Sequence, residues 1–79
     1  MIITRHAVDR FRERCSEDFS RQAAFHYLRE KLKDRVQEAR DVLSFMNDVR
    51  FDVGFGLLAI VVKDGHKILC TTVREKKYN

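Results

Sequence analysis

The chain contains no proline and no tryptophan, and only three glycines and two cysteines among its 79 residues. Without proline or a glycine- and serine-rich stretch there is no interior linker, so we expect residues 1–79 to form a single domain. No apolar run approaches the length of roughly 20 residues that spans a bilayer, so no membrane partner is expected. The first residues enter a structured pattern at once, and we expect no targeting leader.

The two cysteines, Cys15 and Cys70, lie far apart in the sequence. Two thiols without a secretion signal favour a reducing compartment, so we expect a cytoplasmic protein with two buried free thiols; a single disulfide is the alternative. The spacings C-x-x-C and H-E-x-x-H are missing, and three scattered histidines do not replace them. We therefore expect neither a metal nor another cofactor. A glycine-rich phosphate loop and the sharp turn of a hydrolase nucleophile are missing as well.

The chain carries an excess of positive charge. Sixteen Lys and Arg residues face twelve Asp and Glu residues, which gives a net charge of +4. Such a balance favours a polyanion partner, because each cation placed on a phosphate releases a condensed counterion. The alternative is that the excess serves solubility alone.

Helix-forming and charged residues fill the chain before Asn47. Thr4 is a good N-cap, and residues 5–15 place apolar side chains on one face at helical spacing, which predicts a first helix. A longer amphipathic helix is predicted over about residues 21–46, either unbroken or bent near Asp34. Two residues are candidates for its N-cap: Asp18 and Ser20.

Beyond Asn47 the pattern changes to β-branched and aromatic residues. Residues 49–53 alternate as a half-buried strand does, residues 57–63 are nearly all apolar, and residues 66–73 form a third strand. The segment Gly54-Phe55-Gly56 is expected to form a turn or a bulge. Asp64-Gly65 is expected to supply the two positive φ angles of a type I′ hairpin turn.

The expected fold is therefore α+β, with two N-terminal helices, the second one long, packed on a three-stranded antiparallel β-meander. The apolar segment at 57–63 is expected to be the central strand, covered on both faces. The charged tail, residues 74–79, is expected to fray.

The first helix carries one basic stripe. His6, Arg10 and Arg14 are spaced i, i+4 and i+8, so they lie along one line that borders the apolar face. An arginine offers a forked donor to phosphate, and a histidine exchanges a proton near neutral pH. The alternative is structural: His6 bonds to the second helix, and the arginines cover the core and pair with nearby acids. The acids within reach are Glu13, Glu17 and Asp18.

Further basic residues gather on one flank of the second helix, at the predicted hairpin tip and in the tail. A basic flank can follow a phosphate backbone, and basic residues beside an aromatic can bind a single strand. Each group has a solvated surface as its alternative, and the sorted charges of the second helix can instead steer self-association. The candidate nucleic-acid contacts are Arg10, Arg14, Arg29, Lys33, Arg40, Lys63, Lys67, Lys76 and Lys77.

If the chain is an enzyme, its chemistry must come from His, Arg, Lys and Tyr. This set suits metal-independent RNA cleavage, because the 2′-hydroxyl of the RNA is itself the nucleophile. The protein then removes and returns a proton and stabilises the charge that develops on phosphorus.

The segment 3–14, Ile-Thr-Arg-His-Ala-Val-Asp-Arg-Phe-Arg-Glu-Arg, resembles the opening helix of small bacterial and phage proteins with a His-Ala-x-x-Arg-Phe/Met-x-x-Arg signature. Residues 61–73 resemble their terminal hairpin, with Thr72 at its threonine position. These proteins are similar in turn to the RelE/ParE-type toxin fold, from which this chain departs in its long middle helix and short sheet. The resemblance implies helices followed by an antiparallel sheet, and ribonuclease or ribosome-directed activity. The catalytic candidates that it implies are His6, Arg10, Arg14 and Tyr78.

Three functions follow from these patterns. The first is a nucleic-acid-binding domain, with RNA favoured, that extends to a metal-independent toxin-like ribonuclease. The second is a non-enzymatic phage-type module that docks on a host or defence protein complex and inhibits it. The third is a structural homodimer in which the second helix pairs with its twin.

Overall fold

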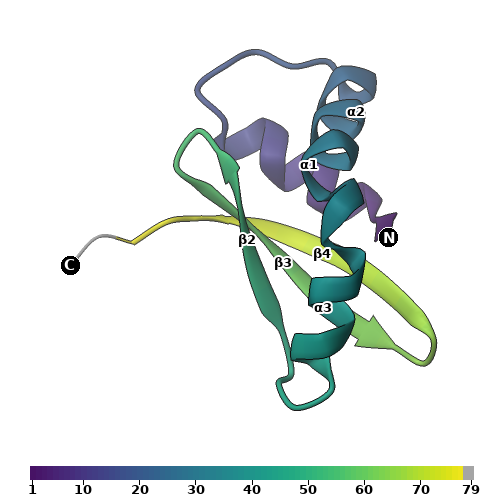
Figure 1. Cartoon of the computed structure of the whole chain (residues 1–79). Coiled ribbons are helices and arrows are strands. Elements are labelled where there is room, and N and C mark those ends of the chain that lie inside the picture. The colour runs from purple at the N-terminus through teal and green to yellow at the C-terminus, as the bar shows by residue number, and fades with distance from the viewer. Residues whose placement is uncertain (78–79) are drawn as a thin grey trace.

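The computed structural model describes residues 1–77 and has the expected α+β architecture (Figure 1). Its helices precede an antiparallel β2-β3-β4 meander. None of the helices within residues 1–77 is long and apolar enough to cross a membrane. In chain order the elements are β1 (Ile2–Ile3), α1 (Arg5–Arg14), α2 (Arg21–Leu32), the 3-10 turn η1 (Lys33–Arg35), α3 (Val36–Leu43), β2 (Val49–Gly54), β3 (Leu57–Asp64) and β4 (Lys67–Glu75).

The sheet has a fourth strand that the sequence pattern does not reveal. β1 pairs in parallel with β4, so the strand order is β1-β4-β3-β2 and the sheet is mixed. The backbone N–H of Thr4 continues this pairing with a hydrogen bond of 3.1 Å to the Cys70 carbonyl oxygen. A strand of two residues contains too little alternation for its periodicity to be recognised.

The helix starts follow the predicted caps. The Thr4 hydroxyl accepts a hydrogen bond from the Ala7 N–H at 3.1 Å, and of the two candidates for the second cap it is Ser20 that accepts from Ala23, also at 3.1 Å. The long second helix is bent, because η1 interrupts it at residues 33–35, around Asp34. Its last segment, α3, ends at Leu43, three residues earlier than predicted.

The helices cover one face of the sheet only. Alternate strand residues point into a single core with the apolar faces of the helices, whereas their neighbours on the other face do not belong to that core. The expectation that residues 57–63 are covered on both faces is therefore wrong. The core residues of the strands are Phe51, Val53, Leu57, Ala59, Val61, Ile68, Cys70 and Val73, and those of the helices include Ala7, Val8, Phe11, Ala24, Leu28, Leu32, Ala39 and Leu43.

Both cysteines are free, as expected, but they differ in environment. Cys70 is fully buried, whereas Cys15 is half-buried. Burial raises the pKa of the Cys70 thiol to about 12, because the protein interior disfavours the thiolate. Cys70 therefore behaves as a small core hydrophobe.

The segment Gly54-Phe55-Gly56 forms a turn between β2 and β3, as expected, whereas the turn between β3 and β4 differs from the expected geometry. The positive φ angles of a type I′ turn occur at Phe55 and Gly56, between β2 and β3, with φ of 55° and 70°. In the β3–β4 turn, Asp64 pairs with Lys67, so the two turn residues are Gly65 and His66. Only Gly65 has a positive φ there, so the prediction of a type I′ turn at Asp64-Gly65 is wrong.

Four aromatic rings fasten the β2–β3 turn to the helices. Phe11, Phe19, Tyr27 and Phe55 are in mutual contact, with ring centroids 5.3 to 6.3 Å apart. The Tyr27 hydroxyl also donates a hydrogen bond to the Val53 carbonyl oxygen. Partial burial, assisted by the nearby Cys15 and Asp52, raises the pKa of Tyr27. This cluster positions the end of the sheet at which the tail lies.

Candidate nucleic-acid interface

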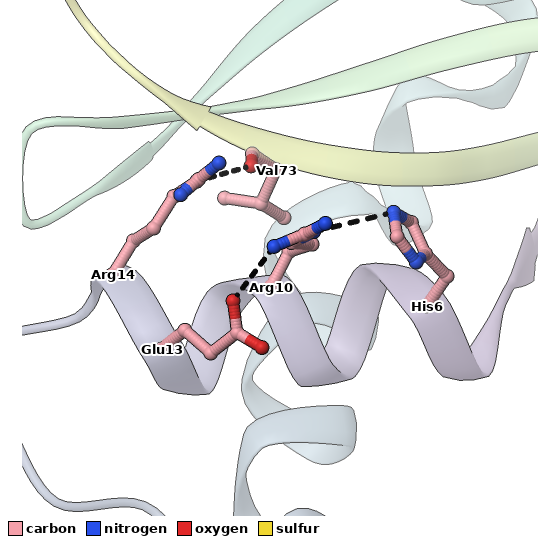
Figure 2. A network of polar contacts seen from close by, with 5 residues as sticks. All are labelled: His6, Arg10, Glu13, Arg14 and Val73. Atoms are coloured by element: carbon pink, nitrogen blue, oxygen red, sulfur yellow. Dashed lines mark hydrogen bonds and ion pairs between the residues drawn. The ribbon is translucent and has the colours of Figure 1, made fainter.

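The predicted stripe lies where α1 meets β4, and all three side chains rise from the helix toward that strand (Figure 2). Arg14 Nε donates a hydrogen bond of 3.1 Å to the Val73 carbonyl oxygen. Arg10 Nε lies 3.4 Å from His6 Nε2, and Arg10 Nη1 forms an ion pair of 2.9 Å with Glu13. The expected position at the boundary of helix and core is therefore confirmed.

Much of the stripe is engaged in local structure. β1 pairs with only the first part of the outer edge of β4. Farther along this edge, the Val73 carbonyl oxygen accepts its hydrogen bond from Arg14 instead of from a strand. Arg10 divides its donors between Glu13 and His6. In this arrangement the His6 Nε2 lone pair, which a general base would use, accepts a hydrogen bond from Arg10.

The tail is anchored as far as Lys76, which corrects the prediction that it frays from residue 74. β4 extends to Glu75, and the Lys76 N–H donates a hydrogen bond of 2.8 Å to the Gly56 carbonyl oxygen. The Lys76 ammonium forms an ion pair with Asp52. Asp52 also accepts the Gly54 N–H at 2.9 Å. The ion pair, and after it the hydrogen bond from Gly54, hold the pKa of Asp52 below its ordinary value.

Five basic side chains meet at this end of the sheet. Residues 74–77 and Arg14 line a hollow of about 330 Å³ at the edge of β4. The same four tail residues line a second hollow of about 550 Å³ on the uncovered face, together with Arg50, Leu58 and Ile60. We call the basic residues of the two hollows the tail cluster: Arg14, Arg50, Arg74, Lys76 and Lys77.

Strand register explains the apolar floor of the second hollow. Leu58 lies between Asp52 on β2 and Arg74 on β4, and Ile60 lies between Arg50 and Thr72. Although it lies on the uncovered face, Ile60 is only 7% exposed. The aliphatic stems of long basic side chains can cover such a residue while their charged ends stay in water. The result is an apolar strip bordered by guanidinium and ammonium groups.

The other predicted contacts lie elsewhere. Arg29 and Lys33 line a different hollow beside β1, and Lys33 forms an ion pair of 2.7 Å with Glu30. This pair lowers the pKa of Glu30 and raises that of Lys33, each through the hydrogen bond first and the opposite charge second. Arg40 is exposed on α3.

Lys63 near the end of β3 and Lys67 at the start of β4 flank the β3–β4 turn. This turn lies at the opposite end of the sheet from the tail (Figure 1). Lys63 is six strand positions from Leu57, which pairs with Glu75, and this corresponds to about 20 Å along the sheet. Tyr78 lies outside the described residues. The structure therefore brings Arg14, Lys76 and Lys77 together and leaves the remaining candidates apart from them.

Sequence reasoning missed Arg50 and Arg74 as site residues. Alternation along 49–53 does place Arg50 on the face opposite Phe51 and Val53, so that signal was available. Arg74 could not be placed in the same way, because the predicted third strand ended at Val73. Its position opposite Leu58 depends on the extension of β4 to Glu75.

Comparison with protein-family models, curated proteins and solved structures gives no match for this chain. Within residues 1–77, no group of three or more His, Cys, Asp and Glu side chains is arranged to hold a metal ion. The function must therefore be inferred from the geometry of the tail cluster.

Proposed function

We propose that this protein binds single-stranded RNA through the tail cluster. The observation that supports this proposal is the convergence of five basic side chains on two adjoining hollows. They come from three elements, α1, β2 and β4, and from the residues that follow β4. Glu75 is the only acidic residue that lines either hollow within residues 1–77.

The floor of the larger hollow favours a single strand over a duplex. Leu58 and Ile60 offer an apolar surface to the face of an unstacked base, and the guanidinium groups of Arg50 and Arg74 can stack on a base or bind a phosphate. Reading a duplex through its major groove requires a helix or a ribbon that enters the groove. A hollow on a sheet face instead receives a splayed strand.

Cleavage would extend the same proposal. Arg14 belongs both to the stripe and to the tail cluster, so an RNA bound there would pass close to Arg10 and His6. With Tyr78 included, these groups could supply proton transfer and charge stabilisation. The two free thiols fit a cytoplasmic location for such a protein.

The first experiment measures binding of a fluorescein-labelled oligouridylate to the full chain over a range of salt concentrations. We expect the affinity to fall as salt rises, with a slope of about −0.7 for each phosphate neutralised. The double variant Arg74→Ala with Lys77→Ala should lower the affinity at low salt roughly tenfold and should reduce the magnitude of the slope by about 1.4, because two cations are removed. Both residues are exposed, so the variant should keep the fold.

The matched comparison is Lys63→Ala with Lys67→Ala, which removes the same charge from the opposite end of the β3–β4 hairpin. We expect it to cost less than half as much binding free energy as the tail pair. Equal losses would contradict a defined site, and absence of binding at low salt would reject the proposal. Cleavage is tested with the same oligonucleotide: if the chain cuts it, His6→Ala and Arg10→Ala should abolish product formation while binding persists.

A further inference from the structure

Two further hollows open beside β1, on a surface that shares no residue with the tail cluster. One has a volume of about 450 Å³ and the other about 510 Å³. Ile3 and Phe25 line both of them, so together they form one groove between β1 and α2, which we call the β1 groove. Its apolar lining includes Ile2, Ile3, Val8, Phe25, Leu32 and Val36.

The charged side chains of this groove all have the same sign. Within the described chain, Arg5, Arg21, Arg29 and Lys33 are the only ionisable side chains that line it. Arg21 is paired with Asp9 at 3.4 Å, and Lys33 with Glu30.

Arg5 and Arg29, in contrast, form no hydrogen bond or ion pair within residues 1–77, although Arg29 lies close enough to Glu30 to contribute to lowering its pKa. Two cations beside an apolar surface thus remain available to carboxylates. Their charge complements an acidic ligand and would repel a basic one.

The backbone of β1 offers a third element of recognition. The Thr4 N–H points to β4, where it meets the Cys70 carbonyl oxygen. Because successive backbone groups of a strand point to opposite sides, the N–H and C=O of Ile3 point away from β4, toward the open edge of the sheet. An extended peptide can add to such an edge by main-chain hydrogen bonds.

We propose that the β1 groove binds an acidic, partly apolar peptide segment of a partner protein in an extended conformation. The peptide backbone pairs with Ile3, and alternate apolar side chains enter the floor beside Phe25. Carboxylates on the segment pair with Arg5 and Arg29 at the rim. The docking surface is separate from the proposed RNA site, so a protein partner and an RNA can bind at the same time.

The test uses a defined probe, a soluble peptide of alternating glutamate and valine, titrated into the isotope-labelled full chain. We expect amide shifts to concentrate at Ile2, Ile3, Arg5, Phe25 and Arg29. The charge-reversal variant Arg5→Glu with Arg29→Glu should weaken binding roughly tenfold or more, since it replaces two attractions with two repulsions. The matched variant Arg40→Glu with Lys63→Glu, which changes the net charge equally at exposed positions outside the groove, should change the affinity by less than about twofold.

Control ligands separate the alternatives. A lysine-valine peptide of the same length should not bind, because the rim repels it. Shifts confined to another surface, equal binding of the two peptides, or equal weakening by the two double variants would each overturn the proposal. Saturation of the groove by dodecanoate without any response to the glutamate-valine peptide would also overturn it, in favour of a small anionic amphiphile.

Discussion

At the scale of single residues, Gly54 and Tyr27 show how closely one turn is fitted to one helix. Gly54 has a φ of +88°, and a Cβ atom built on it would lie 2.7 Å from the Tyr27 hydroxyl oxygen. The same hydroxyl holds the Val53 carbonyl oxygen. Both the backbone angle and the Tyr27 side chain therefore require glycine at position 54. At Gly56, with a φ of +70°, only the backbone angle favours glycine, because no atom lies within 4 Å of such a Cβ.

This difference gives a matched pair of substitutions. Gly56→Ala adds only the cost of a left-handed alanine, about 1 kcal/mol, whereas Gly54→Ala adds a steric clash and should cost about 2–3 kcal/mol. Urea unfolding of the two variants measures both values. In the background Tyr27→Phe, which removes the clashing oxygen, Gly54→Ala should cost less than it does alone. Equal costs for the two alanines would show that the ring yields without penalty.

The buried thiol gives a second test at this scale. At pH 8 a thiol whose pKa is about 12 is ionised in only about one molecule in ten thousand, and Cys70 is also shielded by the core. We expect iodoacetamide to modify Cys15 in the native protein and to leave Cys70 intact until denaturant is added. Peptide mass mapping locates the label, and rapid native labelling of Cys70 would contradict the packing of β4.

Local signals at individual residues could largely be read from the sequence. Thr4 and Ser20 act as caps because a hydroxyl that precedes a helix satisfies an unpaired N–H wherever the helix lies. The turn types could not be read, because they depend on which residues pair. The shift of one position at Asp64 moves the turn to Gly65 and His66, and the aromatic cluster holds Phe55 at a φ that its own side chain disfavours.

At the scale of elements, the informative strand is β4. Its central part was predictable from alternation, but its extension to Glu75 and the anchoring of Lys76 depend on partners in β2 and in the β2–β3 turn. β1, which the sequence pattern did not reveal, likewise depends on a distant partner, because it pairs with β4. The stripe on α1 followed from helical geometry, whereas its proximity to the tail did not.

The ion pair between Lys76 and Asp52 makes the anchoring of the tail dependent on pH. Because the folded pKa of Asp52 is lowered, the pair stabilises the tail above the ordinary carboxyl pKa of about 3.9, and this contribution is lost as the pH falls through the folded value. Amide relaxation at Lys76 and Lys77 should therefore report greater mobility near pH 2.5 than near pH 6. Asp52→Asn should show the acidic behaviour already near pH 6, and an unchanged tail in that variant would contradict the pair.

At the scale of the whole molecule, the amphipathic second helix bears on the predicted homodimer. Its apolar side chains Leu28, Leu32 and Leu43 are buried in the core of the same chain, so this face is not free to pair with a twin. Among residues 1–77, the most exposed large apolar side chain is Phe45, 76% exposed, and Met46 follows it in the sequence. Self-association would have to use another surface, such as this one.

We accordingly expect a monomer across the micromolar range, with a sedimentation coefficient that does not change with concentration. Sedimentation velocity measures this directly, and a concentration-dependent shift would contradict it. If a dimer forms, the variant Phe45→Ser with Met46→Ser should dissociate it. Retention of the dimer in that variant would direct attention to the uncovered sheet face.

The parallel pairing of β1 with β4 also has a consequence for the order in which the protein acquires its shape during synthesis. α1 follows β1 directly and packs against β4 more than against any other element, yet about 55 residues separate the end of α1 from the middle of β4. At roughly 5–20 residues per second, the ribosome needs about 3–11 s to supply them. During that time the apolar face of the first helix is without its final partner, and a nascent-chain chaperone has its opportunity to bind there.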